Sequence, residues 1–204
     1  MDSEYTFLAL MHRMNYIERW ALMRNARTEN VGEHSLEVCM ILHLLCEIGN
    51  SRFGRHLDPG RAVLLALYHD APEILTGDMP TPVKYYNDRI RESYRDIEEA
   101  AKDRLLGTLP GDLKEKYEKV LTPAEDEKLL AGLLKAADKL SALIKCMEEE
   151  SAGNGEFRTA LETTRKTVLD LAGEYPEVKV FMDEFLPAYG RTLDELTNKV
   201  SEEE

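Results

Sequence analysis

LLALYHDAPEILTGDM, residues Leu64–Met79, is the stretch from which the fold and the site of this chain can be read. The apolar run Leu64–Tyr68 ends directly in His69 and Asp70. Polar side chains at the end of a core-forming run cost several kcal/mol unless they are paired. The adjacent imidazole and carboxylate therefore predict a metal ion at a buried helix end, and the rest of the chain has to supply further ligands.

The composition is that of an ordinary globular protein. Of 204 residues, 43% are hydrophobic and 32% are charged, which predicts one domain over 1–204, with a core of about 5–195 and a frayed acidic tail at 200–204. The formal net charge of −13 argues against nonspecific binding to nucleic acid or to an anionic membrane. Because acidic and basic residues balance in residues 1–30, an anionic ligand is expected to bind near this segment.

The absence of targeting signals in the sequence predicts a cytoplasmic protein. No apolar run approaches the roughly 18 residues of a membrane helix, and the N-terminal segment lacks the basic region of a signal peptide. Cys39, Cys46 and Cys146 lie in apolar helical patterns without a CxxC motif. An odd number of such cysteines favours reduced core thiols over disulfides or zinc ligation.

Helix-start signals recur along the chain and predict an all-α fold, a helical bundle. Asn30–Glu33 resembles a capping box, Asp58-Pro59 pairs an N-cap with proline at the first helical position, and Thr122–Glu125 resembles a second capping box. Apolar residues at helical spacing follow each signal. Further helices are predicted over residues 5–14, from 82, 88–106, 111–120, 156–172, 176–186 and 190–199.

Three of the predicted helices have sequence signals for their ends. Gly49-Asn50 predicts that the helix from Asn30 ends near Ile48. Pro72 lacks an amide donor and predicts an end or kink just after Asp70. The helix from Thr122 is expected to run to about residue 150.

Two further polar side chains join His69 and Asp70 as candidate metal ligands. His34 lies in the first turn of its helix, and Asp138 interrupts the apolar stripe of the long helix. Imidazole with carboxylate suits a divalent transition metal and not calcium, and Co, Mn, Zn, Ni, Cu and Fe are not distinguished. The alternatives are hydrogen-bonded structural histidines and an Asp138 carboxylate paired with arginine or lysine. His43 is predicted to be a partly buried packing residue.

The spacing of these ligands, together with longer blocks around them, resembles a known family. The pattern His34, His69-Asp70 and Asp138 is similar to that of HD-domain metal-dependent phosphohydrolases. The blocks around it resemble the bacterial 5′-deoxynucleotidases of the YfbR group, over about residues 5 to 195. These blocks are ERWALMRNARTENV (18–31), EHS (33–35), YHDA (68–71), LTGD (75–78), PTPVKY (80–85) and KAAD (135–138). Gly32, Pro72 and Met79 depart from the family pattern without removing a ligand.

The resemblance implies one divalent metal ion bound by His34, His69, Asp70 and Asp138. It assigns Glu73 to catalysis, by orienting or deprotonating water or by protonating the leaving 5′-oxygen. The implied reaction is hydrolysis of 2′-deoxyribonucleoside 5′-monophosphates to deoxynucleoside and phosphate.

The resemblance also implies the substrate contacts. Arg19 would orient the phosphate, because its planar fork suits that group. Trp20 would lie against C2′ of the sugar and leave no space for a 2′-hydroxyl, and Asp78 would accept a hydrogen bond from the 3′-hydroxyl. The remaining substrate-binding residues by resemblance are His34, Asp70, Met79, Pro80 and Thr81.

Family members are homodimers, so a homodimer is expected, with apolar faces offered by the late helices at Val180, Phe181, Phe185 and Leu186. Two alternatives stay open. One is an HD phosphohydrolase acting on a cyclic nucleotide or a nucleotide polyphosphate. The other is a non-catalytic all-α module with a structural metal or none.

Overall fold

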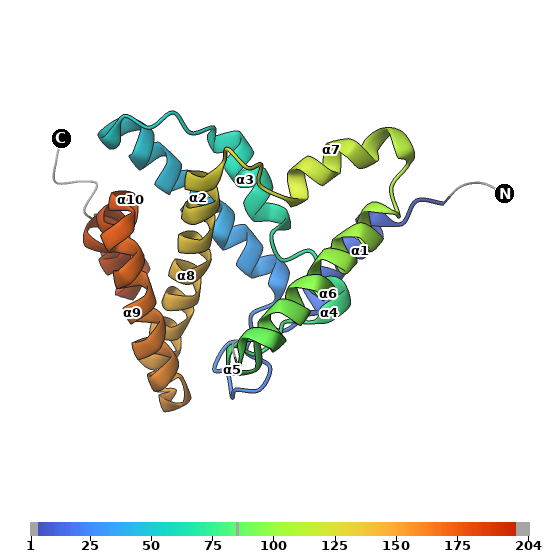
Figure 1. Ribbon diagram of the computed structural model, residues 1–204. Coiled ribbons are helices and arrows are strands. Elements are labelled where there is room, and N and C mark those ends of the chain that lie inside the picture. Colours follow the sequence, from blue (N-terminus) through green and yellow to red (C-terminus); the bar gives the residue numbers. More distant parts are fainter. Residues whose placement is uncertain (1–3, 85, 199–204) are drawn as a thin grey trace.

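A computed structural model describes residues 4–84 and 86–198, and within these ranges the regular elements are helices (Figure 1). The all-α prediction is confirmed. Three helices form the centre: α2 (Val31–Phe53), α3 (Pro59–Tyr68) and α8 (Lys128–Ser151). Beside α8 lies α9 (Arg158–Glu174), and α10 (Pro176–Val180) packs against α9 and α2, while α1 (Phe7–Met11), α6 (Asp88–Leu106) and α7 (Gly111–Leu121) lie on the far side of α3. The short helices are α4 (Glu73–Thr76), α5 (Thr81–Lys84) and α11 (Leu193–Asn198).

Two apolar clusters make up the core, and the chain after α3 joins them. The larger cluster fills the space between α2, α3, α8, α9 and α10 and includes Ala66. The smaller one contains Ala71 together with Phe7, Leu105, Leu106 and Leu121. His69 and Asp70 lie in sequence between Ala66 and Ala71, so packed side chains on both sides restrain the segment that carries them.

The predicted start signals of α2 and α3 are confirmed. The side chain of Asn30 accepts from the Glu33 amide at 3.0 Å, and the Glu33 carboxylate accepts from the Asn30 amide at 3.2 Å. Asp58 Oδ1 accepts from the amides of Gly60 and Arg61 at 2.9 and 3.1 Å. Both caps satisfy amides that have no partner inside the helix.

The predicted capping box at Thr122–Glu125 is wrong. A turn occupies this segment, and α8 begins only at Lys128. The carboxylate that binds the turn belongs to Glu127, which accepts from the Ala124 amide at 2.7 Å and from two nitrogens of Arg61 at 2.8 Å each. The bidentate pair with Arg61 of α3 is a tertiary contact, and it favours Glu127 over the Glu125 of the predicted capping box as the residue that binds the turn.

The predicted end of α2 near Ile48 is also wrong. The helix continues to Phe53 and closes at Gly54, whose φ of 62° is the left-handed conformation that glycine adopts readily. Gly49 therefore lies inside the helix, where a Cβ atom would stand 3.1 Å from Glu177 Oε1. This glycine provides space for a neighbouring side chain and does not stop the helix.

Shorter helices differ from the prediction in their detail. The stretch 5–14 divides into α1 and a tighter turn over 12–16, and 176–186 divides into α10, a wider turn over 181–185 and a tighter one from 186. His43, predicted to be partly buried, is exposed. None of the helices in the described residues is long and apolar enough to cross a membrane. The predicted fraying at 200–204 lies outside the described residues.

Candidate active site and metal centre

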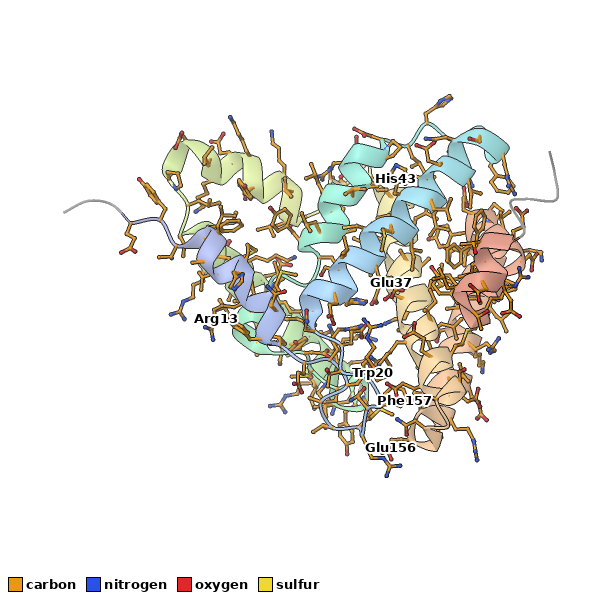
Figure 2. All side chains as sticks on the ribbon, turned by 180° about the vertical axis from the view of Figure 1, so that it is seen from behind. Arg13, Trp20, Glu37, His43, Glu156 and Phe157 are labelled. Carbon is orange, nitrogen blue, oxygen red and sulfur yellow. The ribbon has the colours of Figure 1, made fainter. Side chains whose placement is uncertain are left out.

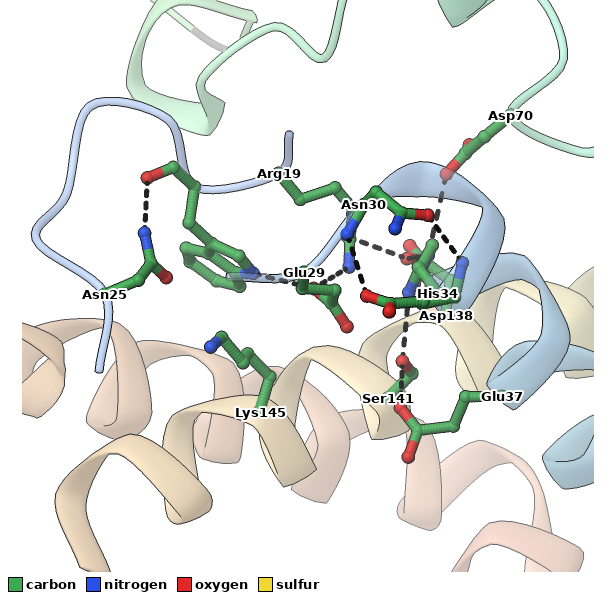
Figure 3. Close-up of polar contacts among 12 residues, drawn as sticks. Arg19, Asn25, Glu29, Asn30, His34, Glu37, Asp70, Asp138, Ser141 and Lys145 are labelled. Atoms are coloured by element: carbon green, nitrogen blue, oxygen red, sulfur yellow. Dashed lines mark hydrogen bonds and ion pairs between the residues drawn. The ribbon is translucent and has the colours of Figure 1, made fainter. Parts of the chain in front are cut away.

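The four predicted ligands come from three central segments and meet at one place, where Figure 3 shows His34, Asp70 and Asp138. His34 opens α2, His69 and Asp70 follow α3, and Asp138 lies in the middle of α8. The ligand atoms of His34, His69 and Asp70 all lie within 4.8 Å of one another. Asp138 stands outside that three-residue group, but its Oδ1 lies 3.3 Å from His34 Nε2. The structure thus brings the four side chains together, and their joint role as ligands stays a prediction.

Hydrogen bonds at the far side of each imidazole ring orient the two histidines. His34 Nδ1 lies 2.9 Å from Ser141 Oγ, and Ser141 donates to Glu37 Oε2 at 2.6 Å. His69 Nδ1 lies 2.7 Å from the carbonyl oxygen of Ala66, which can only accept. Both rings therefore direct Nε2 toward the carboxylates of the cluster, and neither Nε2 has a hydrogen-bond partner.

These unpartnered nitrogens fit a bound cation. His34 Nε2 lies 3.5 Å from Asp70 Oδ2, and His69 Nε2 lies 3.1 Å from the same oxygen. Buried polar atoms without partners are costly, and two imidazole nitrogens with a carboxylate form a donor set for a divalent transition ion. Burial lowers the pKa of His69, but the neighbouring charge of Asp70 outweighs burial and raises it. The Asp70 carboxylate therefore attracts positive charge at His69, whereas burial and the charge of Arg19 lower the pKa of His34.

The carboxyl groups of Asp70 and Glu73 differ in protonation. Burial opposes ionisation of Asp70, yet the positive charge of His69 and then of His34 holds its pKa well below the usual range. Glu73 is 8% exposed, and burial, with repulsion from Asp70 and Asp78, raises its pKa to about 9. The turn across Pro72 keeps the two close, because the Glu73 amide bonds the Asp70 carbonyl at 3.0 Å. A carboxylate beside a carboxylic acid is an arrangement that can exchange a proton with a substrate.

One carboxylate oxygen connects the predicted phosphate-binding and sugar-binding residues. Glu29 Oε2 accepts from a terminal nitrogen of Arg19 at 2.9 Å and from Trp20 Nε1 at 3.2 Å. A terminal nitrogen of Arg19 also lies 3.9 Å from Asp138 Oδ1, at the edge of the ligand cluster. Trp20 has a φ of 58°, and its ring lies 5.3 Å from that of Phe157 (Figure 2). This conformation costs about 1–3 kcal/mol for a bulky residue, and the surrounding contacts have to maintain it.

A buried ion pair on α8 anchors the loop that follows Trp20. Lys145 and Glu149 are 4% and 1% exposed and pair with each other. Glu149 also accepts from the amides of Ala26 and Arg27 at 2.7 and 3.2 Å and from Asn154 Nδ2 at 2.7 Å. Lys145 Nζ donates to the Arg27 carbonyl. The loop is thereby fixed to the central helix through its backbone.

The predicted substrate loop lies beside Trp20. The backbone amide of Trp20 donates to the Asp78 carboxylate, whose pKa burial raises while the charge of Arg19 acts in the opposite direction. Met79 and Pro80 are half-buried, and Thr81 is exposed at the start of α5. Substrate contacts of these four residues stay predictions.

Comparison with known proteins places the chain in a family. Residues 6–189 match the family model described as 5′-deoxynucleotidase YfbR-like. The chain belongs to the YfbR-like family. This YfbR-like chain is 45% identical over 193 residues to a 5′-deoxynucleotidase of Erwinia tasmaniensis, and the match covers 95% of this chain and 96% of that protein.

Solved structures with the same architecture support the HD-domain fold of this YfbR-like chain. An HD-domain phosphohydrolase from Listeria innocua aligns with a TM-score of 0.80 at 24% identity and covers 96% of both chains. The cyanophage S-2L HD phosphohydrolase DatZ, solved with dA and one catalytic Zn²⁺ ion, aligns with a TM-score of 0.57 at 18% identity, covering 88% of this chain and 95% of its own. The predicted HD-domain fold is confirmed.

Several polar residues around the site of this YfbR-like chain have no motif or helix-end signal in the sequence. They are Ser141, Lys145 and Glu149. Together with Asp138 they recur at intervals of three, four and four residues, which places them on one face of α8. The sequence signal that could have identified these residues is a row of polar side chains on a helix face that is otherwise apolar.

Proposed function

We propose that this YfbR-like chain is a phosphoric monoester hydrolase that converts 2′-deoxyribonucleoside 5′-monophosphates to deoxynucleosides. One water molecule is consumed, the bond between phosphorus and the 5′-oxygen breaks, and that oxygen takes up a proton. The observation that carries this proposal is the Glu29 carboxylate, which holds Arg19 and Trp20 side by side at the ligand cluster. In the proposed complex, the Arg19 guanidinium would bind the phosphate and the Trp20 indole would face the sugar, on either side of the reacting bond.

The residues that would hold the metal are His34, His69, Asp70 and Asp138. When bound, a divalent ion supplies charge neutralisation on phosphate and lowers the pKa of coordinated water. The donor set accepts Mn, Fe, Co, Ni, Cu or Zn, and we propose a single ion.

The other residues act directly on the substrate. Arg19 is proposed to orient the phosphate, with its own position set by Glu29 and Asp138. Asp78 would accept from the 3′-hydroxyl. Glu73 would hold a proton in its buried, charge-repelled carboxyl group and give it to the leaving 5′-oxygen.

Replacing Glu73 by glutamine is expected to lower kcat about 10²- to 10⁴-fold, because the amide keeps the shape but cannot transfer a proton. The measurement is phosphate release from deoxyadenosine 5′-monophosphate at saturating Zn²⁺. Metal content, determined by elemental analysis, should stay at the wild-type level. A kcat within twofold of wild type would remove Glu73 from the mechanism.

Replacing Trp20 by alanine is expected to reduce the preference for deoxyadenosine over adenosine 5′-monophosphate about 10- to 100-fold. The physical reason is that a pocket closed against C2′ gains room for a hydroxyl group, whose rejection by packing is worth about that factor. The measurement is kcat/KM for both substrates in both proteins. An unchanged ratio would contradict the proposed role of the indole.

The same substrate panel tests the function itself. A cyclic nucleotide and a nucleotide polyphosphate are added to the panel. If either is a better substrate than the deoxynucleoside monophosphates, the protein is an HD phosphohydrolase with a different activity. No phosphate release from any deoxynucleotide by folded, metal-loaded protein would overturn the proposed function.

We also propose a homodimer in the cytoplasm. Of the four predicted interface residues, Phe181 and Leu186 are buried within the protomer, while Val180 and Phe185 are half-buried. Leu36 and Met40 are both 59% exposed and lie one turn apart on α2, which leaves an apolar strip for a second copy. Sedimentation should give the mass of a dimer for wild type and of a monomer for Met40→Glu, and a monomeric wild type would refute the proposal.

The buried free cysteines agree with the proposed cytoplasmic location, because the cytoplasm is a reducing compartment.

A further inference from the structure

A three-residue chain of hydrogen bonds leads from α2 to α8 and back to the ligand cluster (Figure 3). Ser141 Oγ lies 2.6 Å from Glu37 Oε2 and 2.9 Å from His34 Nδ1. Ser141 and His34 are fully buried, at 0% exposure each, and Glu37 is half-buried. Because Glu37 lies one turn after His34 on the same helix, α2 supplies both ends of the chain and α8 supplies its middle.

The direction of each hydrogen bond follows from the number of protons. An ionised carboxylate can only accept, so the single hydroxyl proton of Ser141 points to Glu37. Burial raises the pKa of Glu37 above its usual range, and the hydrogen bond donated by Ser141 offsets this rise only in part. With its proton engaged, Ser141 can only accept from His34, and the imidazole proton must then reside on Nδ1.

This arrangement decides which nitrogen of His34 is bare. A neutral imidazole carries one proton, so a proton on Nδ1 leaves Nε2 with a lone pair. Nε2 is the atom that faces Asp70 and Asp138 without a hydrogen-bond partner. Only this tautomer can offer Nε2 to a metal ion.

We propose that Glu37, acting through Ser141, is a positioning residue that selects the metal-binding tautomer of His34. The proposal rests on the metal site of the proposed function. Both tautomers of the ring carry one proton, so Glu37 changes the location of that proton and not the charge of the histidine. If the carboxylate is removed, the Ser141 hydroxyl is free to donate to Nδ1, and the ring proton moves to Nε2, where it blocks ligation.

The first test observes the tautomer without metal. In apo protein labelled with ¹⁵N at histidine, two-bond ¹H–¹⁵N correlations distinguish a protonated Nδ1 from a protonated Nε2. We expect protonated Nδ1 at His34 in wild type and a shift toward protonated Nε2 in Glu37→Leu. The proposal is overturned if wild type already carries the proton on Nε2, or if both proteins give the same tautomer.

The second test measures affinity for Zn²⁺ alone by competition with a chelator. Loss of an outer partner of a metal-binding histidine weakens binding about 10- to 100-fold, and we expect this for Glu37→Leu and for Ser141→Ala. Because Glu37 acts through Ser141, the double variant should bind no more weakly than Ser141→Ala. Additive losses would contradict the proposed chain.

A matched control separates tautomer selection from loss of charge. Glu148 is exposed on α8 and lines the same small cavity as Glu37. Glu148→Leu removes the same charge next to the same cavity, and we expect the wild-type tautomer and wild-type Zn²⁺ affinity. Both tests are independent of phosphate release, so a protein with no deoxynucleotidase activity could still confirm or refute the role of Glu37.

Discussion

Asp70→Asn is expected to lower kcat/KM for phosphate release roughly 10³-fold or more, because the charge neutralisation that a bound metal supplies is worth several kcal/mol. Asp70 Oδ2 lies 3.5 Å from His34 Nε2 and 3.1 Å from His69 Nε2, so one oxygen connects both imidazoles. Asparagine keeps the shape but removes the negative charge. The measurement is phosphate release from deoxyadenosine 5′-monophosphate with Zn²⁺, together with the metal content of the purified protein.

The control for Asp70 is a carboxylate of the same type that caps a helix away from the cluster. Asp58→Asn is expected to keep activity, since asparagine also caps helices well. The melting temperature of apo Asp70→Asn should stay near that of apo wild type. Wild-type turnover with bound metal in Asp70→Asn would refute its role. An inactive wild type whose fold depends on Asp70 and metal would favour the non-catalytic module.

Lys145→Met is expected to lower the free energy of unfolding by about 3–5 kcal/mol, which is the cost of leaving one member of a buried ion pair without its partner. Lys145 and Glu149 are 4% and 1% exposed, so solvent cannot compensate for the lost ammonium group. Methionine fills a similar volume, and the loss is therefore electrostatic. Urea denaturation at pH 7 of wild type and variant gives the difference.

Acid titration provides a second measure of the same pair. Burial opposes ionisation of Glu149, but hydrogen bonds from Lys145, Asn154 and two backbone amides outweigh it and lower the pKa of Glu149 to about 2 from 4.5. Because the pKa of Glu149 is lower in the folded than in the unfolded protein, the ionised carboxylate stabilises the fold above pH 4.5. That stabilisation is lost as pH falls from 4.5 toward 2. Lys145→Met should show a smaller loss over this range. A change in unfolding free energy below 1 kcal/mol at pH 7 would show that the pair contributes little.

The start signals of α2 and α3 and the candidate ligands could be read from the sequence because the physics behind them is local. Asn30 and Asp58 cap their helices through amides two or three residues away, and no distant contact is needed. Asp138 stood out because a carboxylate in an apolar stripe requires a partner. Its adjacency to His34 came from the packing of α2 against α8, which the apolar pattern predicts only in general terms.

Only the tertiary structure decided which partners the buried polar groups have. The Glu127 carboxylate pairs with Arg61 where α8 starts later than its local signal, and Gly49 lies inside α2 with the Glu177 side chain beside it. Glu29 and Ser141 contribute to the site through hydrogen bonds to residues that are distant in sequence or on another helix. Helical spacing determines which face a side chain occupies, and the contacts that decide its partner form only when the helices pack. The stretch Leu64–Met79 therefore specified two candidate ligands and a catalytic candidate, while packing supplied the groups that orient them.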